Sequence, residues 1–234
     1  QAKFEKARKV FDNVFNKYDL MNDLMSLGVH RLWKERLIDW MGPKKTDHLI
    51  DMASGTGDIA KIFLKRTKNS RRVTCVDSNN FMLSECRKKL VDYKNVDWVC
   101  SPAEKLPFKD NQFDIYTVSF GIRNFSNIEA SLEEAIRVLK PGGRIFCLEF
   151  SKIDNEILNK LYKMYSKTIP IFGKIIVGKS EPYEYLVKTI DEFYNQDQLL
   201  NFSRNDYVYS DWSIENRSYF NAIKIEKIMM TLLL

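Results

Sequence analysis

Two acidic residues and two glycines have the spacing of a nucleoside-binding βα unit. Asp51 closes a short apolar run, Gly55 and Gly57 follow it, and an amphipathic segment begins directly afterwards. This order predicts strand, tight turn and helix, and glycines in such a turn let the backbone approach a ligand closely. Asp77 ends the next predicted strand, twenty positions after Gly57, where an acid can accept the two hydroxyls of a ribose.

The same turn argues against a dinucleotide. A pyrophosphate fingerprint reads G-x-G-x-x-G, whereas this chain has Ala53, Ser54 and Ala60. S-adenosylmethionine has ribose and adenine but no phosphate, and its amino acid end and sulfonium favour an acid such as Asp51 beside the loop. We therefore expect S-adenosylmethionine. A tight βα connection without a ligand and a nicotinamide oxidoreductase are the alternatives.

The elements around this unit predict an α/β fold. They are a helix at 79–91, strands at 96–100 and 113–119, a helix at 128–139, a turn at 140–143 and a strand at 144–150. Such alternation is typical of a mostly parallel sheet with helices on both faces, on which ligands bind beyond the carboxyl ends of the strands. The loops at that edge cover residues 51–58, 77–80, 101–104 and 119–124. Their convergence predicts one active site.

Helical segments flank this core. Apolar residues at helical spacing predict helices at 3–18 and 28–41, which belong to the core or cap the cofactor pocket. Residues 154–193 are also helical and strongly apolar, so they either pack on the sheet or form a lid that meets a membrane. The lysines on the rim of that lid are Lys160, Lys163, Lys167, Lys174 and Lys179. Weak alternation at 206–226 predicts a final antiparallel hairpin.

We expect one domain over 1–234, because the chain has no repeats and no low-complexity linker. Its predicted parts are an N-terminal helical cap (1–45), a cofactor-binding core (46–150), a helical lid (151–195) and C-terminal strands (196–234).

Composition excludes several classes of protein. The chain has 234 residues, of which 44% are hydrophobic and 29% charged, with a net charge of +6, as in ordinary globular proteins. Its four cysteines have no C-x-x-C spacing, so no metal site is expected. No apolar run approaches the ~20 residues of a membrane span. The dispersed charge and the lack of an Asn/Asp-Pro-Pro-aromatic motif make nucleic acid an unexpected partner. The chain starts at Gln1 and not at Met, so both a removed transit peptide and a simple boundary of the sequence are compatible with it.

Several blocks together resemble the ubiquinone/menaquinone biosynthesis C-methyltransferase family. They cover residues 17–26, 28–34, 51–58, 103–108, 119–124, 137–144, 148–151 and 183–186. The Lys-Pro-Gly-Gly turn at 140–143 is common to many methyltransferases. The tyrosine-led block at 17–26 and the sequence Ser-Phe-Gly-Ile-Arg-Asn at 119–124 are much more specific.

The resemblance implies a Rossmann-like class I methyltransferase fold with seven strands. It also implies methylation of a ring carbon of a polyprenylated benzoquinol in ubiquinone biosynthesis, with S-adenosylmethionine as cofactor and S-adenosylhomocysteine as product. Methylation of a demethylmenaquinol in menaquinone biosynthesis and a catalytically weak scaffold of a quinone-synthesis complex are the alternatives.

The resemblance also assigns cofactor-binding residues: Asp51, Ala53, Gly55, Thr56, Gly57, Asp77, Ser78, Pro102, Ala103 and Ser119. It implies that Asp77 holds the ribose, that the backbone at 102–103 meets the adenine and that Ser119 lines the methionine end. Two positions depart from the family. Ser54 stands where glycine is usual and could crowd the loop, and Pro102 replaces an asparagine and removes a contact to adenine.

Arg123, Asn124 and Tyr18 are the expected catalytic residues. The quinol ring carbon becomes nucleophilic as a phenolate, and a phenol titrates near ~10. Arg123 cannot act as a direct base, because the pKa of arginine is above ~12. It can stabilise the phenolate or polarise a water that carries the proton away. The alternative to this catalytic role is a structural ion pair. Asn124 and Tyr18 would hydrogen-bond the quinol oxygens. His30 is a base candidate by chemistry, with local packing as its alternative.

A polyprenyl quinol as substrate implies a place at a membrane. For a eukaryotic chain we expect the matrix side of the mitochondrial inner membrane, and for a bacterial chain a cytoplasmic, membrane-associated protein. Peripheral membrane contact, a quinone-synthesis complex and a homodimer are all compatible with the resemblance.

Overall fold

The computed structural model describes residues 20, 22, 23, 26, 28–44, 46–150, 156–178, 180–194, 198 and 199. The chain divides into two compact units, Gln1–Glu149 and Phe150–Leu234, which are described separately below. The helix expected at 3–18, the hairpin expected at 206–226 and Tyr18 lie outside the described residues.

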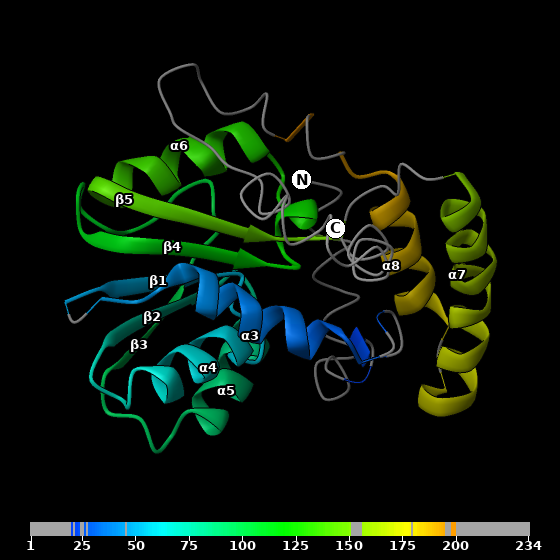
Figure 1. Ribbon diagram of the computed structural model, residues 1–234, viewed down its shortest axis with the longest axis horizontal. Coiled ribbons are helices and arrows are strands. Elements are labelled where there is room, and N and C mark those ends of the chain that lie inside the picture. Colours follow the sequence, from blue (N-terminus) through cyan, green and yellow to red (C-terminus); the bar gives the residue numbers. More distant parts are fainter. Residues whose placement is uncertain are drawn as a thin grey trace, which may run out of the picture. The chain divides into compact units, whose positions relative to one another are not determined.

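A parallel sheet forms the centre of the first unit (Figure 1). Its strands are β1 (His48–Met52), β2 (Arg72–Asp77), β3 (Val96–Cys100), β4 (Phe113–Ser119) and β5 (Leu139–Leu148). Their order in the sheet is β3-β2-β1-β4-β5, and every neighbouring pair is parallel. The predicted α/β fold with a parallel sheet is therefore confirmed, with five strands in the described part of the chain where the resemblance implied seven.

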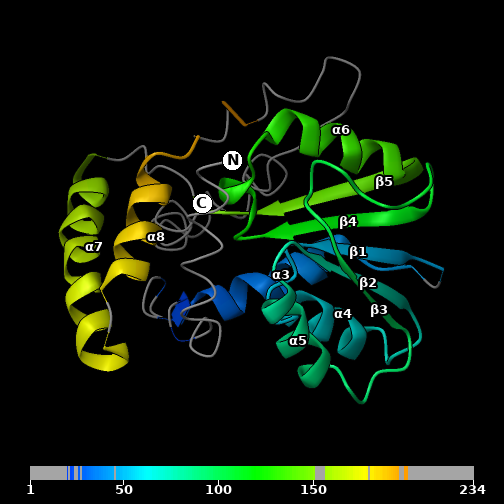
Figure 2. The same cartoon turned by 180° about the vertical axis from the view of Figure 1, so that it is seen from behind.

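Helices cover this sheet and bury its apolar side chains. They are α3 (His30–Met41), α4 (Asp58–Arg66), α5 (Asn80–Lys89) and α6 (Ile128–Val138). In Figures 1 and 2, α6 lies beside β5, and α5 lies beside β2 and β3. Side-chain and glycine caps mark the ends of these helices. Asn79 caps α5 by accepting from two backbone N–H groups, and Asn127 caps α6 by accepting from that of Ala130. Gly42 ends α3 in the left-handed conformation.

The start of β5 differs from the prediction. The expected strand began at 144, after a Lys-Pro-Gly-Gly turn, but β5 begins at Leu139, so the turn residues belong to the strand. The pairing of β4 with β5 is interrupted between Phe113 and Ile115, where the register shifts. A register shift of this kind is a β-bulge, in which one strand accommodates extra residues. The Lys-Pro-Gly-Gly sequence is typical of a turn, so it did not predict a bulged strand.

The second unit contains α7 (Glu156–Val177) and α8 (Glu181–Asp191), so the helical prediction for 154–193 is confirmed. Gly178, with φ of +80°, lies between the two helices. A Cβ at Gly173 would come within 2.2 Å of the ring of Tyr183, so the absence of a side chain lets α8 pack closely on α7. No helix among the described residues is both long and apolar enough to cross a bilayer.

Candidate functional site

The site lies where the strand order reverses. The chain runs from β1 through β2 to β3, and then returns to place β4 on the other side of β1. Ligands of such sheets bind at this switch point, beyond the carboxyl ends of the strands. A cavity of about 20 Å³ occupies that position, with room for roughly one water molecule. Its lining residues are Asn22, Lys34, Asp51, Ala53, Ser54, Gly55, Thr56, Asp58, Ile59, Ser119 and Phe120.

Close backbone packing shapes the loops around this cavity. Gly57 has φ of +83°, and a Cβ there would lie 2.6 Å from Sγ of Cys86, so only glycine fits the position without strain. A Cβ at Gly121 would lie 2.5 Å from Cβ of Ala53. The predicted glycine turn is therefore confirmed, and the close contact of Gly121 with Ala53 joins the turn after β1 to the loop after β4.

Asp51 is a buried acid at the end of β1, with an exposed fraction of 1%. Its Oδ1 accepts a hydrogen bond of 3.0 Å from the hydroxyl of Thr117, while its Oδ2 has no hydrogen-bond partner in the described part of the structure. Burial raises the pKa of Asp51 to about 7, although the hydrogen bond from Thr117 acts in the opposite direction. A cationic ligand group beside Oδ2 would favour the charged form of Asp51, which burial alone disfavours.

Asp77 links the end of β2 to the glycine turn. Its Oδ2 accepts from the backbone N–H of Gly55 at 2.9 Å, and its Oδ1 accepts from that of Asn79 at 2.8 Å. Burial raises the pKa of Asp77 to about 6, and the backbone N–H groups of Asn79, Gly55 and Ser78 oppose that rise. Each carboxylate oxygen can accept a second hydrogen bond, so Asp77 can hold the turn and accept ribose hydroxyls together.

The loop expected to meet adenine lies beside Asp77. The backbone N–H of Ser101 donates to the carbonyl of Asp77 at 3.1 Å. This hydrogen bond places the backbone of Ser101 next to the end of β2. Of the two residues that follow, Pro102 is exposed and Ala103 is buried. The roles of Pro102 and Ala103 toward adenine stay predictions.

Two lysines and one acid form a cluster that the sequence analysis did not assign. The Nζ of Lys34 contacts Oδ2 of Asp58 at 2.7 Å. Lys89 contacts the other oxygen of Asp58 and also Oγ1 of Thr56, the latter at 3.3 Å. Burial disfavours the charge of Asp58, but the attraction of Lys34 and Lys89 outweighs it and holds the pKa of Asp58 well below its usual range.

A signal for Lys34 was present in the sequence. Lys34 lies on the same helical face as Leu37, Ile38 and Met41, at spacings of three, four and seven residues, and all four side chains are buried. A charged residue on an apolar stripe is rarely buried without a partner. The position of Lys34 on this apolar face therefore indicates a functional or paired lysine.

Arg123 forms a buried ion pair. It lies in a 3₁₀ turn (Ile122–Asn124) with an exposed fraction of 1%, and its Nη1 contacts Oε1 of Glu149 at 2.5 Å. Glu149 follows β5 and was not singled out in the sequence. The ion pair considered as an alternative for Arg123 is thus present, whereas its catalytic role stays a prediction. Asn124 is half-buried in the same turn.

His30 makes the local contact that was considered for it. Its Nε2 lies 2.8 Å from Oδ1 of Asp23, which also accepts from Arg31. Burial lowers the pKa of His30, the positive charge of Lys34 lowers it further, and the hydrogen bond to Asp23 opposes both. The contact with Asp23 is thus the local packing considered as the alternative for His30, and its role as a base stays a prediction.

The polar atoms of the cavity fit the amino acid end of S-adenosylmethionine. Besides Oδ2 of Asp51, the hydroxyls of Ser54 and Ser119 and both amide atoms of Asn22 are buried without a hydrogen-bond partner among the described residues. Buried polar groups normally have partners, so these atoms match a polar ligand. Ser54 has no positive φ, so its side chain lines the cavity without backbone strain.

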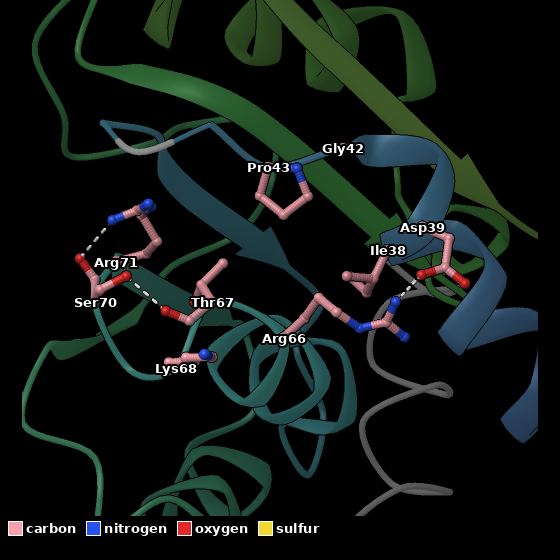
Figure 3. A pocket seen from close by; sticks show the side chains of 9 residues that line it. All are labelled: Ile38, Asp39, Gly42, Pro43, Arg66, Thr67, Lys68, Ser70 and Arg71. Atoms are coloured by element: carbon pink, nitrogen blue, oxygen red, sulfur yellow. Dashed lines mark hydrogen bonds and ion pairs between the residues drawn. The ribbon is translucent and has the colours of Figure 1, made fainter.

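A larger cavity of about 570 Å³ lies elsewhere (Figure 3). It is lined by Ile38, Asp39, Gly42, Pro43, Arg66, Thr67, Lys68, Ser70 and Arg71. These residues stand at the ends of α3 and α4 and just before β1 and β2. The cavity therefore borders the amino ends of the strands, the edge opposite the predicted site, and its size does not make it the active site.

The sequence is similar to a family of methyltransferases. The model of the ubiE/COQ5 methyltransferase family matches residues 1–211. A protein of Ruegeria sp. named ubiquinone/menaquinone biosynthesis C-methyltransferase UbiE is 47% identical over 83% of this chain and 79% of its own length. A protein of the same name from Rickettsia bellii is 48% identical over 82% of this chain and 80% of its own.

Solved structures show the same fold. A SAM-dependent methyltransferase from Thermotoga maritima has a TM-score of 0.60 and 20% identity, covering 85% of this chain and 79% of its own. Another from Aquifex aeolicus has a TM-score of 0.52 and 23% identity, covering 61% and 74%.

Proposed function

The chain belongs to the ubiE/COQ5 methyltransferase family, and from this we propose that it transfers a methyl group from S-adenosylmethionine to a ring carbon of a polyprenylated benzoquinol in ubiquinone biosynthesis. The observation that carries the proposal is the 47–48% identity, over more than four fifths of the chain, to proteins named ubiquinone/menaquinone biosynthesis C-methyltransferase. Methylation of a naphthoquinol in menaquinone biosynthesis is the second candidate, because the printed name of those relatives covers both pathways.

S-adenosylmethionine is the cofactor of this class of enzyme and, when bound, supplies an electrophilic methyl group. Asp77 would accept the ribose hydroxyls, and the turn at Gly55 and Gly57 would let the backbone approach the ligand. Asp51 and Ser119, at the ends of β1 and β4, face the cavity where the amino acid end would lie. On this proposal the methyl transfer takes place at the switch point of the sheet.

The protein must also favour the phenolate form of the quinol. A guanidinium has five N–H donors, so Arg123 can contact Glu149 and an oxyanion at the same time, and Glu149 acts as a positioning residue. In a buried site a positive charge near the leaving proton lowers the pKa of the phenol. The proton would leave through a water polarised by Arg123, and Asn124 would orient the quinol by a hydrogen bond.

Features of α7 support peripheral contact with a membrane. Leu161, Met164 and Ile171 are 55%, 67% and 61% exposed, and exposed lysines at positions 160, 163, 167 and 174 stand beside them on α7. Apolar side chains rimmed by lysines are typical of helices that lie in the interface of an anionic bilayer. A polyprenyl substrate resides in that bilayer, which supports the same conclusion.

Membrane contact can be tested by co-sedimentation with anionic phospholipid vesicles. Replacing Leu161 and Met164 by Gln should reduce binding. Val91→Gln, a change at a 74% exposed residue of the first unit, is the matched control and should bind as the wild type does. Equal binding by all three proteins would remove α7 from the contact. The matched relatives are bacterial, so we propose a cytoplasmic, membrane-associated location; they give no support to a mitochondrial one.

The substrate can be identified with labelled S-adenosylmethionine. The protein is incubated in parallel with a demethylated benzoquinol and a demethylated naphthoquinol, and the labelled product identifies the substrate. Labelling of neither quinol by a protein that binds the cofactor would contradict the proposal and favour the scaffold.

The role of Arg123 is tested with Arg123→Lys, which keeps a charge beside Glu149 but removes the planar fork. We expect turnover to fall while the affinity for S-adenosylmethionine stays near that of the wild type. Unchanged turnover would leave Arg123 as a structural partner of Glu149.

A further inference from the structure

Lys34 places a positive charge inside the cofactor cavity. Its exposed fraction is 5%, its Nζ contacts Asp58 at 2.7 Å, and the same atom lies 5.8 Å from the centre of the Phe120 ring. A buried charge is costly unless other charges and hydrogen bonds compensate it. The position of this buried charge on the cavity wall therefore calls for a functional explanation.

The charges around Lys34 leave room for an anion. Asp58 contacts two ammonium groups, those of Lys34 and Lys89. Because Lys89 also contacts Asp58, Lys34, which lines the cavity, can turn toward a ligand while Lys89 keeps Asp58 paired. An anionic ligand group beside Lys34 would take the place of its contact with Asp58.

Asn22 independently points to a ligand at the same place. Its side chain is 1% exposed and lines the cavity. Neither its Nδ2 nor its Oδ1 has a hydrogen-bond partner among the described residues. Leaving both atoms of a buried amide unpaired is costly, and a polar ligand in the cavity would remove that cost.

The cavity also contains the opposite charge. Oδ2 of Asp51, which likewise has no hydrogen-bond partner in the described structure, belongs to the same lining as Lys34 and Asn22. A cation and an acid in one small cavity complement a zwitterion, and the amino acid end of S-adenosylmethionine carries a carboxylate and an ammonium on one carbon.

We propose that Lys34 and Asn22 form the subsite for the carboxylate of S-adenosylmethionine, opposite Asp51, which takes the ammonium group. This inference rests on the proposed function, which makes S-adenosylmethionine the cofactor. Because the cavity holds roughly one water molecule, Lys34 leaves Asp58 as the ligand enters and donates to the carboxylate instead. The selectivity of the site for the amino acid end then depends on Lys34.

Calorimetric titration with two ligands tests this subsite. Dissociation constants are measured for S-adenosylmethionine and for decarboxylated S-adenosylmethionine, which lacks only the carboxylate. The wild type should bind S-adenosylmethionine about 10- to 100-fold more tightly, as expected for a buried charge-assisted contact. Lys34→Met should lose most of that preference, because its affinity for the decarboxylated compound should not fall.

Lys89→Met is the matched control, since it removes the same charge from the same acid, Asp58, but at a residue outside the cavity lining. It should keep the wild-type preference for the carboxylate. Asn22→Leu should reduce the preference in the same direction as Lys34→Met, and it provides a second variant should Lys34→Met fail to fold.

Equal affinity of the wild type for the two ligands would overturn the subsite whatever the variants do. An equal loss for both ligands in folded Lys34→Met would overturn it as well, because the lysine would then act only on the loop structure. Absence of S-adenosylmethionine binding by the wild type contradicts the proposed function itself. Labelled quinol product together with equal affinities contradicts the subsite alone.

Discussion

Replacing Asp51 by Asn should stabilise the protein above neutral pH while it weakens the cofactor site. Burial raises the pKa of this carboxyl from 3.8 to about 7 in the folded protein, whereas in the unfolded chain it titrates near ~3.9. Between these values the folded state holds a proton that the unfolded state has released. The contribution of Asp51 to stability is therefore fully present below about pH 4 and is lost as the pH rises through about 7.

The magnitude follows from the pKa difference. About three pKa units correspond to about 4 kcal/mol in the free energy of unfolding, and about 2 to 3 kcal/mol of this falls between pH 5 and pH 8. The asparagine of the variant cannot ionise, although its side-chain oxygen can still accept from Thr117. The free energy of unfolding of Asp51→Asn minus that of the wild type should therefore grow by about 2 to 3 kcal/mol from pH 5 to pH 8.

Urea unfolding at the two pH values measures this difference. Ser54→Ala removes an uncharged group from the same cavity wall and serves as the control, because its difference from the wild type should not depend on pH. A difference for Asp51→Asn that is equal at pH 5 and pH 8 would refute the raised pKa. Unchanged affinity of this variant for S-adenosylmethionine at pH 8 would refute the role of Asp51 toward the ammonium group.

Other predictions concern the backbone and the buried ion pair. Gly57→Ala should lower the free energy of unfolding by roughly 2–4 kcal/mol, because the position combines a positive φ with a 2.6 Å approach of the added Cβ to Cys86. Gly142→Ala should cost only about 1–2 kcal/mol, because this position has a positive φ but no atom within 4 Å of the added Cβ. Equal losses in urea unfolding would show that the contact with Cys86 does not contribute. Arg123→Ala should cost about 3–5 kcal/mol because the buried carboxylate of Glu149 loses the opposite charge beside it. Replacing both by Met and Leu should recover most of that loss, and a double variant as unstable as the single one would show that the uncompensated charge is not its cause.

Local patterns in the sequence were sufficient for most of the fold. Strands 96–100 and 113–119 were predicted to the residue, because alternation and apolar runs depend only on neighbouring side chains. The end of α5 and the start of β5 were placed less well. Leu139 begins its strand five residues before the predicted start at 144, since a bulge in the pairing with β4 depends on the partner strand and leaves no local pattern.

The sequence by itself determined the glycine turn with its two acids, Asp51 and Asp77, because a strand end followed by glycines imposes that geometry locally. Only the tertiary structure decided which other groups meet there. Asn22, Lys34 and Ser119 come from distant segments and line one cavity, and Glu149 pairs with Arg123 across 26 positions. Burial and charge pairing depend on contacts between distant segments, so the sequence indicates that Lys34 is unusual, and only the fold shows what it faces.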